Sequence, residues 1–187
     1  MPTTALKQKP ATYQDILDAP PNMVAEILAG TLHTQPRPAL PHAVATANLN
    51  SELIGPFNKG LGGPGGWRIL FEPELHLGND IVVPDLAGWR REAMPDIPDV
   101  AWCETAPAWI CEVLSPSTRR LDQNEKSQCY AREGVSHLWF VDPKAKTLEV
   151  FVLKKGAWLL RAKLEDNAQV SQPPFDAISF PLSALWS

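Results

Sequence analysis

The chain has 187 residues, a formal net charge of -4 and 44% hydrophobic residues. This composition is typical of a globular protein and excludes a disordered chain. The length suits one domain, so we expect a single domain over 1–187 with a flexible N-terminal segment at 1–11. The acidic charge argues against a broad phosphate-binding face, because nonspecific nucleic-acid affinity comes mainly from Lys and Arg.

The cysteines and the N-terminus indicate the cellular compartment in which the protein is expected. The three cysteines form no CxxC pair, and the four histidines have no zinc-site spacing, so a reduced compartment fits best. The N-terminus has no apolar signal region, and no window approaches the roughly 18 consecutive apolar residues of a spanning helix. We therefore expect a cytoplasmic protein without a membrane segment.

The first third of the chain predicts a short helix, a hairpin and a longer helix. The short helix covers 12–18, with Thr12 as N-cap. Strands over 23–28 and 31–35 flank the turn at Ala29-Gly30. Apolar spacing predicts a helix over 41–57, and the glycine-rich stretch that follows predicts a loop.

The rest of the chain predicts mostly strands, over 67–77, 81–89, 108–114, 137–141, 147–153 and 158–162. A helix is predicted over 117–133, which makes a strand-helix-strand unit, and the tail at 180–186 is expected to pack back. Together the elements predict an α/β (mixed α+β) fold with a central mixed sheet flanked by helices and with extra N- and C-terminal strands.

Two carboxylates lie inside apolar strand segments: Asp85 in IVVPDLAGW and Glu112 in WICEVLSP. Burial of an unpaired carboxylate costs several kcal/mol, so each needs a cation partner, a metal ion or a place at a strand end. If the two strands are neighbours, the carboxylates repel each other until a hard divalent cation such as Mg²⁺ or Mn²⁺ lies between them. The pattern thus indicates a metal site that could activate water.

The helix after Glu112 carries Asp122, Lys126 and Tyr130 on one face, because they are spaced i, i+4, i+8. If this helix packs near the carboxylates, Lys126 could bind a scissile phosphate and hold the attacking water. Arg119 and Arg120 at its start could extend the contact with a nucleic acid.

Structural explanations compete with each of these interpretations. Asp85 could bind local backbone amides, and Glu112 could pair with an arginine. Lys126 could form an ordinary helical pair with Asp122, and Tyr130 could simply pack. Glu72 and Glu74, which alternate with apolar residues, could add carboxylates to the site or lie on a solvated strand face, and of the two we keep Glu74 as a candidate.

A set of motifs makes the interpretation more specific. The motifs are Pro84-Asp85, the segment EVLSPST at 112–118, then Asp122, Lys126 and Tyr130, Gly134-Val135, and LWFVDP at 138–143. This pattern resembles the Uma-type family of restriction-endonuclease-like proteins. The EILAG turn at 26–30 and His42 at the start of the following helix also resemble that family, so the resemblance covers most of the chain.

The resemblance implies a PD-(D/E)XK nuclease fold, with Asp85, Glu112 and the Val113 carbonyl as metal ligands and Lys126 as a catalytic residue. Glu26 would assist as a further catalytic residue, and His42 is a candidate supporting residue. The lysine of (D/E)XK would fall at position 114, where this chain has Leu114, so the resemblance implies that Lys126 replaces it from the helix.

The function that follows is metal-dependent hydrolysis of phosphodiester bonds in DNA. A homodimer is expected, because cutting two strands needs two sites and two-fold pairing is the commonest assembly. A catalytically silent nucleic-acid-binding module with the same fold is the alternative, favoured by the acidic charge and the missing lysine at 114. A metal-independent two-carboxylate hydrolase such as a glycosidase is a third, weaker hypothesis.

Overall fold

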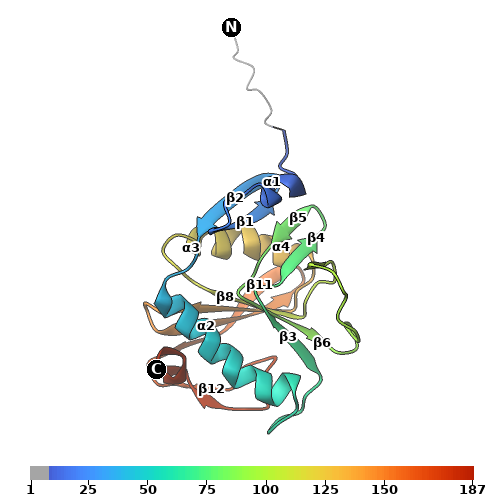
Figure 1. The fold of residues 1–187 in the computed structure, drawn as a ribbon. Helices are drawn as coiled ribbons and strands as arrows, with labels where there is room; N and C mark the ends of the chain where they lie inside the picture. The colour runs from blue at the N-terminus through green and yellow to red at the C-terminus, as the bar shows by residue number, and fades with distance from the viewer. Residues whose placement is uncertain (1–8) are drawn as a thin grey trace.

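The computed structural model describes residues 9–187, which form two main sheets, a short two-stranded ribbon and several helices (Figure 1). The six-stranded sheet has the order β11 (Ala157–Glu165), β10 (Thr147–Lys154), β9 (His137–Asp142), β8 (Trp109–Val113), β6 (Leu86–Arg90) and β3 (Trp67–Phe71). The five-stranded sheet has the order β2 (Thr31–Pro36), β1 (Met23–Leu28), β5 (Asp80–Val82), β4 (Glu74–Leu77) and β7 (Trp102–Cys103). The fold class is therefore mixed α+β, as predicted, but with two sheets where one was expected.

The predicted N-terminal elements are confirmed. Helix α1 (Tyr13–Leu17) begins with a capping box, in which the backbone N–H and the hydroxyl of Thr12 both donate to the Asp15 carboxylate. The β1–β2 turn places Ala29 and Gly30 at positive φ, which glycine tolerates without strain. Most of the segment expected to be flexible, residues 1–8, lies outside the described residues, and the Ala11 N–H donates to the Gly30 carbonyl at 2.8 Å.

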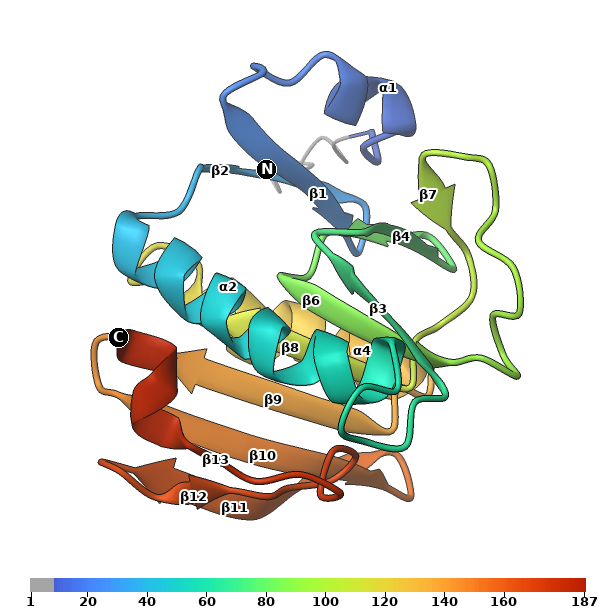
Figure 2. The same cartoon turned by 60° about the horizontal axis from the view of Figure 1, so that its bottom comes forward.

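Helix α2 (Leu40–Leu53) continues as a π-helical turn (Ile54–Asn58), close to the predicted 41–57. It crosses one face of the six-stranded sheet, while the helical segment from α3 (Arg119–Leu121) to α4 (Ser127–Arg132) lies on the opposite face (Figure 2). Between α3 and α4 runs a second π-helical turn (Asp122–Lys126). The strand-helix-strand unit is confirmed, since β8 and β9 pair in parallel with Glu112 opposite Phe140.

Two of the predicted strands are wrong in extent. The segments predicted as 67–77 and 81–89 each break in the middle, into β3 and β4 and into β5 and β6. Pro73 and Pro84 lie at the breaks, where they cannot donate a ladder hydrogen bond, and Glu72 adopts a φ of 43°. The chain thus leaves the six-stranded sheet after β3 and returns to it with β6, and the two crossing points lie side by side because the Glu72 N–H donates to the Asp85 carbonyl at 3.0 Å.

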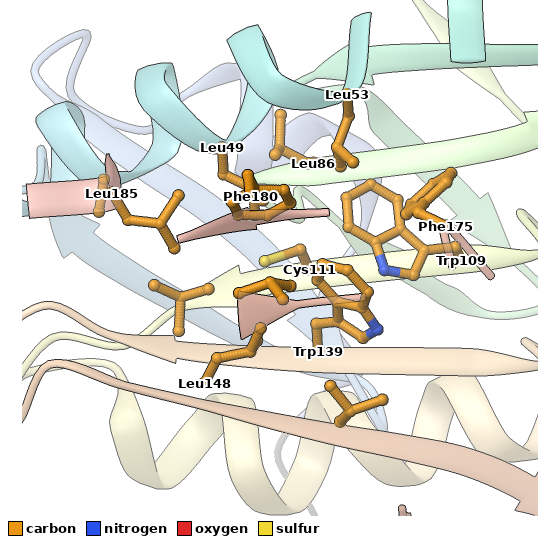
Figure 3. Close-up of a cluster of buried hydrophobic side chains, with 14 of the residues drawn as sticks. Leu49, Leu53, Leu86, Trp109, Cys111, Trp139, Leu148, Phe175, Phe180 and Leu185 are labelled. Carbon is orange, nitrogen blue, oxygen red and sulfur yellow. The ribbon is translucent and has the colours of Figure 1, made fainter. Parts of the chain in front are cut away.

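The apolar core between α2 and the six-stranded sheet is built around aromatic rings (Figure 3). The rings of Trp67, Trp109 and Trp139 all pack against Phe175, with centroid separations of 4.9, 4.8 and 5.8 Å. Gly88 in β6 leaves room for them, because a Cβ there would lie 3.2 Å from Trp109 and 3.3 Å from Trp67.

The C-terminal tail closes this core. After the ribbon of β12 (Gln169–Val170) and β13 (Phe180–Pro181), a 3-10 helix (Leu182–Trp186) buries Leu182 and Leu185 against α2. The predicted hairpin of β10 and β11 and the packing of the tail are both confirmed. Within residues 9–187, no helix has the length and apolarity that a membrane span requires.

Candidate active site

A small cavity of about 40 Å³ lies where the two sheets separate, between the end of β8, the helical segment at 119–126 and strands β1 and β2. Charged and hydroxyl side chains from four separate stretches of the sequence line it: His42, Glu72, Asp85, Glu112, Ser115, Thr118, Asp122 and Lys126. The two breaks that divide the predicted strands deliver Glu72 and Asp85 to this place. The local departure from regular strand structure therefore builds part of the cavity wall.

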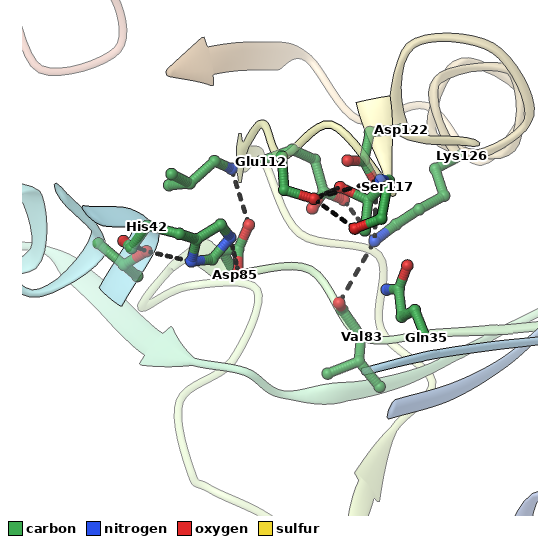
Figure 4. Close-up of polar contacts among 12 residues, drawn as sticks. Gln35, His42, Val83, Asp85, Glu112, Ser117, Asp122 and Lys126 are labelled. Atoms are coloured by element: carbon green, nitrogen blue, oxygen red, sulfur yellow. Dashed lines mark hydrogen bonds and ion pairs between the residues drawn. The ribbon is translucent and has the colours of Figure 1, made fainter. Parts of the chain in front are cut away.

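Asp85 is held in a fixed orientation by one contact to each of its oxygens. The Val113 N–H donates to Oδ2 at 2.7 Å, and His42 Nε2 lies 3.1 Å from Oδ1 (Figure 4). The other ring nitrogen of His42, Nδ1, lies 3.4 Å from the hydroxyl of Thr46, one helical turn further along α2. The first turn of α2 thus braces Asp85 from outside the sheet.

Glu112 also lines the cavity and is fully buried with Lys126. Lys126 Nζ is 2.9 Å from Glu112 Oε1, and the Tyr130 hydroxyl donates to the same oxygen. The π-helical turn carries both Asp122 and Lys126 inward, with 3.6 Å between their charged atoms. π-helical turns are rare and often occur at functional sites.

Glu26 lies behind Lys126 and does not line the cavity. Its Oε1 is 3.0 Å from Lys126 Nζ and accepts from the Val83 N–H at 2.8 Å, while Oε2 accepts from Gln35 Nε2 at 3.2 Å. Lys126 also donates to the Val83 carbonyl at 3.3 Å. Lys126 therefore meets four acceptors with three protons, and all of them belong to the protein.

The carboxylates outnumber the cations in this region. Burial raises the pKa of Glu112 well above its usual value; Lys126 opposes this rise, and the charges of Asp122, Asp85 and Glu26 add to it. Burial likewise raises the pKa of Asp122, to about 6. Burial and the charge of Asp85 raise the pKa of Glu72. Burial alone would lower the pKa of Lys126, but Glu112 and Glu26 raise it, so the lysine stays protonated.

Comparisons with known proteins identify the family of the chain. The sequence profile of the Uma2 family, described as "Putative restriction endonuclease", matches residues 10–183. The chain belongs to the Uma2 family. No curated protein matches it.

The fold of this Uma2 protein is also that of a solved structure. It superposes with a TM-score of 0.76 on a crystal structure from Anabaena variabilis ATCC 29413, described as a putative nuclease belonging to DUF820. The sequences are 20% identical, and the similarity covers 95% of this chain and 98% of the other. The predicted family resemblance and restriction-endonuclease-like fold are therefore confirmed.

The donor chemistry of the cavity fits a hard divalent cation. Such ions take carboxylate and carbonyl oxygens, and the cavity offers Asp85 and Glu112. Because the N–H and C=O of a residue in a strand point to the same edge, the Val113 carbonyl faces the side from which Asp85 approaches. Within residues 9–187, no three His, Cys, Asp or Glu side chains are arranged as a metal site. The Glu112 carboxylate is instead paired with Lys126.

The structure brings most of the predicted site residues together. Asp85, Glu112, Lys126, His42 and Asp122 line the cavity, and Glu26 and Tyr130 contact residues that line it.

Three predicted residues lie elsewhere. Glu74 is on the five-stranded sheet, 2.7 Å from His76. Arg119 pairs with Asp142 in a separate groove, and Arg120 is exposed on the helix surface. Glu72 lines the cavity although it is not among the predicted site residues. The adjacent Pro73, which marks the break in the strand, is the sequence feature that could have indicated it.

Proposed function

We propose that this Uma2 protein is an endonuclease that hydrolyses phosphodiester bonds in DNA with Mg²⁺ or Mn²⁺. The observation that carries the proposal is the convergence of Asp85, Glu112 and Lys126 in one cavity with a surplus of carboxylates. Membership of a family whose description reads "Putative restriction endonuclease" supports it.

In this proposal, Asp85, Glu112 and the Val113 carbonyl hold the metal ion. When bound, the ion would lower the pKa of a water molecule and neutralise charge that develops on the phosphate. His42 and the Val113 N–H orient Asp85, and Tyr130 orients Glu112. These contacts fix the two carboxylates at the floor of the cavity.

Lys126 would act on the phosphate and the attacking water. Its ammonium is bound by Glu112 and Glu26, so contact with a phosphate requires exchange of at least one of these partners. A Glu112 carboxylate that held the cation would attract Lys126 less strongly, and this would favour the exchange. Glu26 would then keep the Lys126 ammonium within reach of the cavity, and Asp122 would remain a second negative charge beside that ammonium.

The test compares wild type, Asp85→Asn/Glu112→Gln and the control Glu74→Gln, whose carboxylate lies outside the cavity. Thermal unfolding is followed across Mg²⁺ and Mn²⁺ concentrations, and cleavage of supercoiled plasmid DNA is followed with and without chelator. We expect the metal to raise the wild-type and control midpoints by linkage, and to leave the double variant unchanged and inactive. An equal response of wild type and double variant would overturn the metal site.

The alternative is a binding module without turnover. It is favoured by one observation, the complete pairing of Lys126 by protein acceptors, which neutralises part of the acidic cluster without a metal. DNA retention by the wild type with no cleavage in Mg²⁺ or Mn²⁺ would support this alternative. We also expect a homodimer and a cytoplasmic location, which sedimentation and cell fractionation would test.

A further inference from the structure

The acidic cavity poses a problem for the proposed substrate, and this inference rests on the proposed function. Four carboxylates line the cavity, from Glu72, Asp85, Glu112 and Asp122, and a phosphodiester carries a negative charge. The ammonium group of Lys126 already contacts acceptors that belong to the protein. A cation at the mouth of the cavity, without a partner of its own, would offset the repulsion.

Arg37 is the candidate for this cation. It lies in the segment between β2 and α2, and its two neighbours in the sequence, Pro36 and Pro38, both line the cavity. Each proline restricts its own φ, so the backbone on either side of Arg37 has little freedom. The backbone of Arg37 is therefore held at the rim of the cavity, while its side chain is exposed.

The charge of Arg37 is not neutralised within the described part of the chain. No described Asp or Glu side chain forms an ion pair with it, and the first turn of α2, directly after it, contains no acidic residue. The field of Arg37 reaches into the cavity, because Arg37 opposes the rise in the pKa of Glu72 that burial and Asp85 cause.

The other arginines near the cavity are less suited to this role. Arg119 follows the cavity residue Thr118, but its guanidinium binds Asp142 and faces a different groove. Arg120 is exposed on the next position of the helix, and its carbonyl accepts from the Asn124 side chain. Arg37 alone of these three lies between two residues that line the cavity.

We propose that Arg37 binds the phosphate backbone of the nucleic acid at the cavity mouth and positions the scissile bond over Asp85 and Glu112. Guanidinium suits this role because its planar fork can donate two parallel hydrogen bonds to one phosphate. Arg37 is thus a substrate-positioning residue, and its loss should weaken binding much more than the rate of the bound complex.

The test uses Arg37→Gln, the conservative Arg37→Lys and the matched control Arg161→Gln. Arg161 is an exposed arginine on β11, an edge strand of the six-stranded sheet. Fluorescence anisotropy of a labelled duplex DNA oligonucleotide gives affinity as a function of salt, and plasmid cleavage in Mn²⁺ gives KM and kcat.

For Arg37→Gln we expect about tenfold weaker binding at low salt, a salt slope reduced by about 0.9, and a raised KM with little change in kcat. Arg37→Lys should recover part of the affinity, and Arg161→Gln should behave as wild type. Cleavage by wild type together with equal effects of Arg37→Gln and Arg161→Gln would overturn the role of Arg37 while leaving the nuclease proposal intact. Absence of both binding and cleavage in the wild type would overturn both proposals.

Discussion

The two faces of strand β8 differ sharply although they share one backbone. Trp109, Cys111 and Val113 point into the apolar core beneath α2. Ile110 and Glu112 point to the other face, where Glu112 meets Lys126 and Tyr130. Alternation along a strand makes this division possible, because successive side chains lie on opposite sides of the sheet.

The comparison indicates which face stabilises the fold and which face serves function. Aromatic packing on the core face removes apolar area from water, which is the main favourable contribution to folding. On the other face, the free-energy cost of desolvating buried charges can exceed the free energy gained from their attraction. The polar face therefore depends on complete pairing, and removal of one member should cost far more than an equivalent change at the surface.

The largest expected effect comes from Lys126→Met, which leaves Glu112 and Glu26 buried without their cation. We expect a loss of about 3–5 kcal/mol in the free energy of unfolding near neutral pH, measured by urea denaturation. The double variant Lys126→Met/Glu112→Gln should recover part of that loss.

The matched control is Lys163→Met, which breaks surface ion pairs with Glu149 and Glu165 on half-exposed side chains. It should cost less than about 1 kcal/mol. If the two lysine variants destabilised the protein equally, the pairing of Lys126 would not be the feature that the polar face depends on.

The next effect is a pH dependence of stability that arises on the polar face. Asp122 has a pKa of about 6, above the ordinary value of 3.8, because burial disfavours its charged form. An acid with a raised pKa binds its proton more tightly in the folded state, so its contribution to stability is present below pH 3.8 and is lost as pH rises to 6. We expect this one group to give a slope of at most about 1.4 kcal/mol per pH unit in that window.

The variant Asp122→Asn should flatten this part of the pH profile, as followed by urea denaturation at a series of pH values. Asp18→Asn serves as the control, since that carboxylate lies on the surface of the N-terminal segment. An unchanged slope in Asp122→Asn would show that Asp122 ionises normally in the folded protein.

The same contrast explains what the sequence could predict. Charges inside apolar stretches of sequence stand out, so Asp85 and Glu112 are predicted, and the helical spacing of Asp122, Lys126 and Tyr130 places these three on one face. Periodicity could not show that the strands break at Pro73 and Pro84, because the apolar alternation of β3 continues into β4. Glu72 and Glu74 consequently seemed to share one strand face, whereas they lie in different surroundings, and only Glu72 lines the cavity.

Contacts between distant segments were also beyond the sequence. The pairing of Arg119 with Asp142 depends on how the helix packs against β9, and the place of Arg37 depends on how the β2–α2 segment meets the end of β8. Neither arrangement has a local sequence signal. The predictable part of the site is therefore the part that burial and helical spacing determine.

The smallest expected effect is a difference in stability between two variants of the core face. The variants replace Trp109 and Trp139, two tryptophans that pack on the same phenylalanine. Trp139 Nε1 donates to the Pro173 carbonyl at 3.0 Å, whereas the buried Nε1 of Trp109 has no partner among the described residues. Both Trp109→Phe and Trp139→Phe lose similar apolar area, but Trp139→Phe also leaves a carbonyl unpaired. We expect Trp139→Phe to be the more destabilising by about 1 kcal/mol in urea denaturation. If Trp109→Phe cost as much, hydrogen bonding would contribute nothing measurable to this core, and aromatic packing alone would account for the stability of the face opposite Glu112.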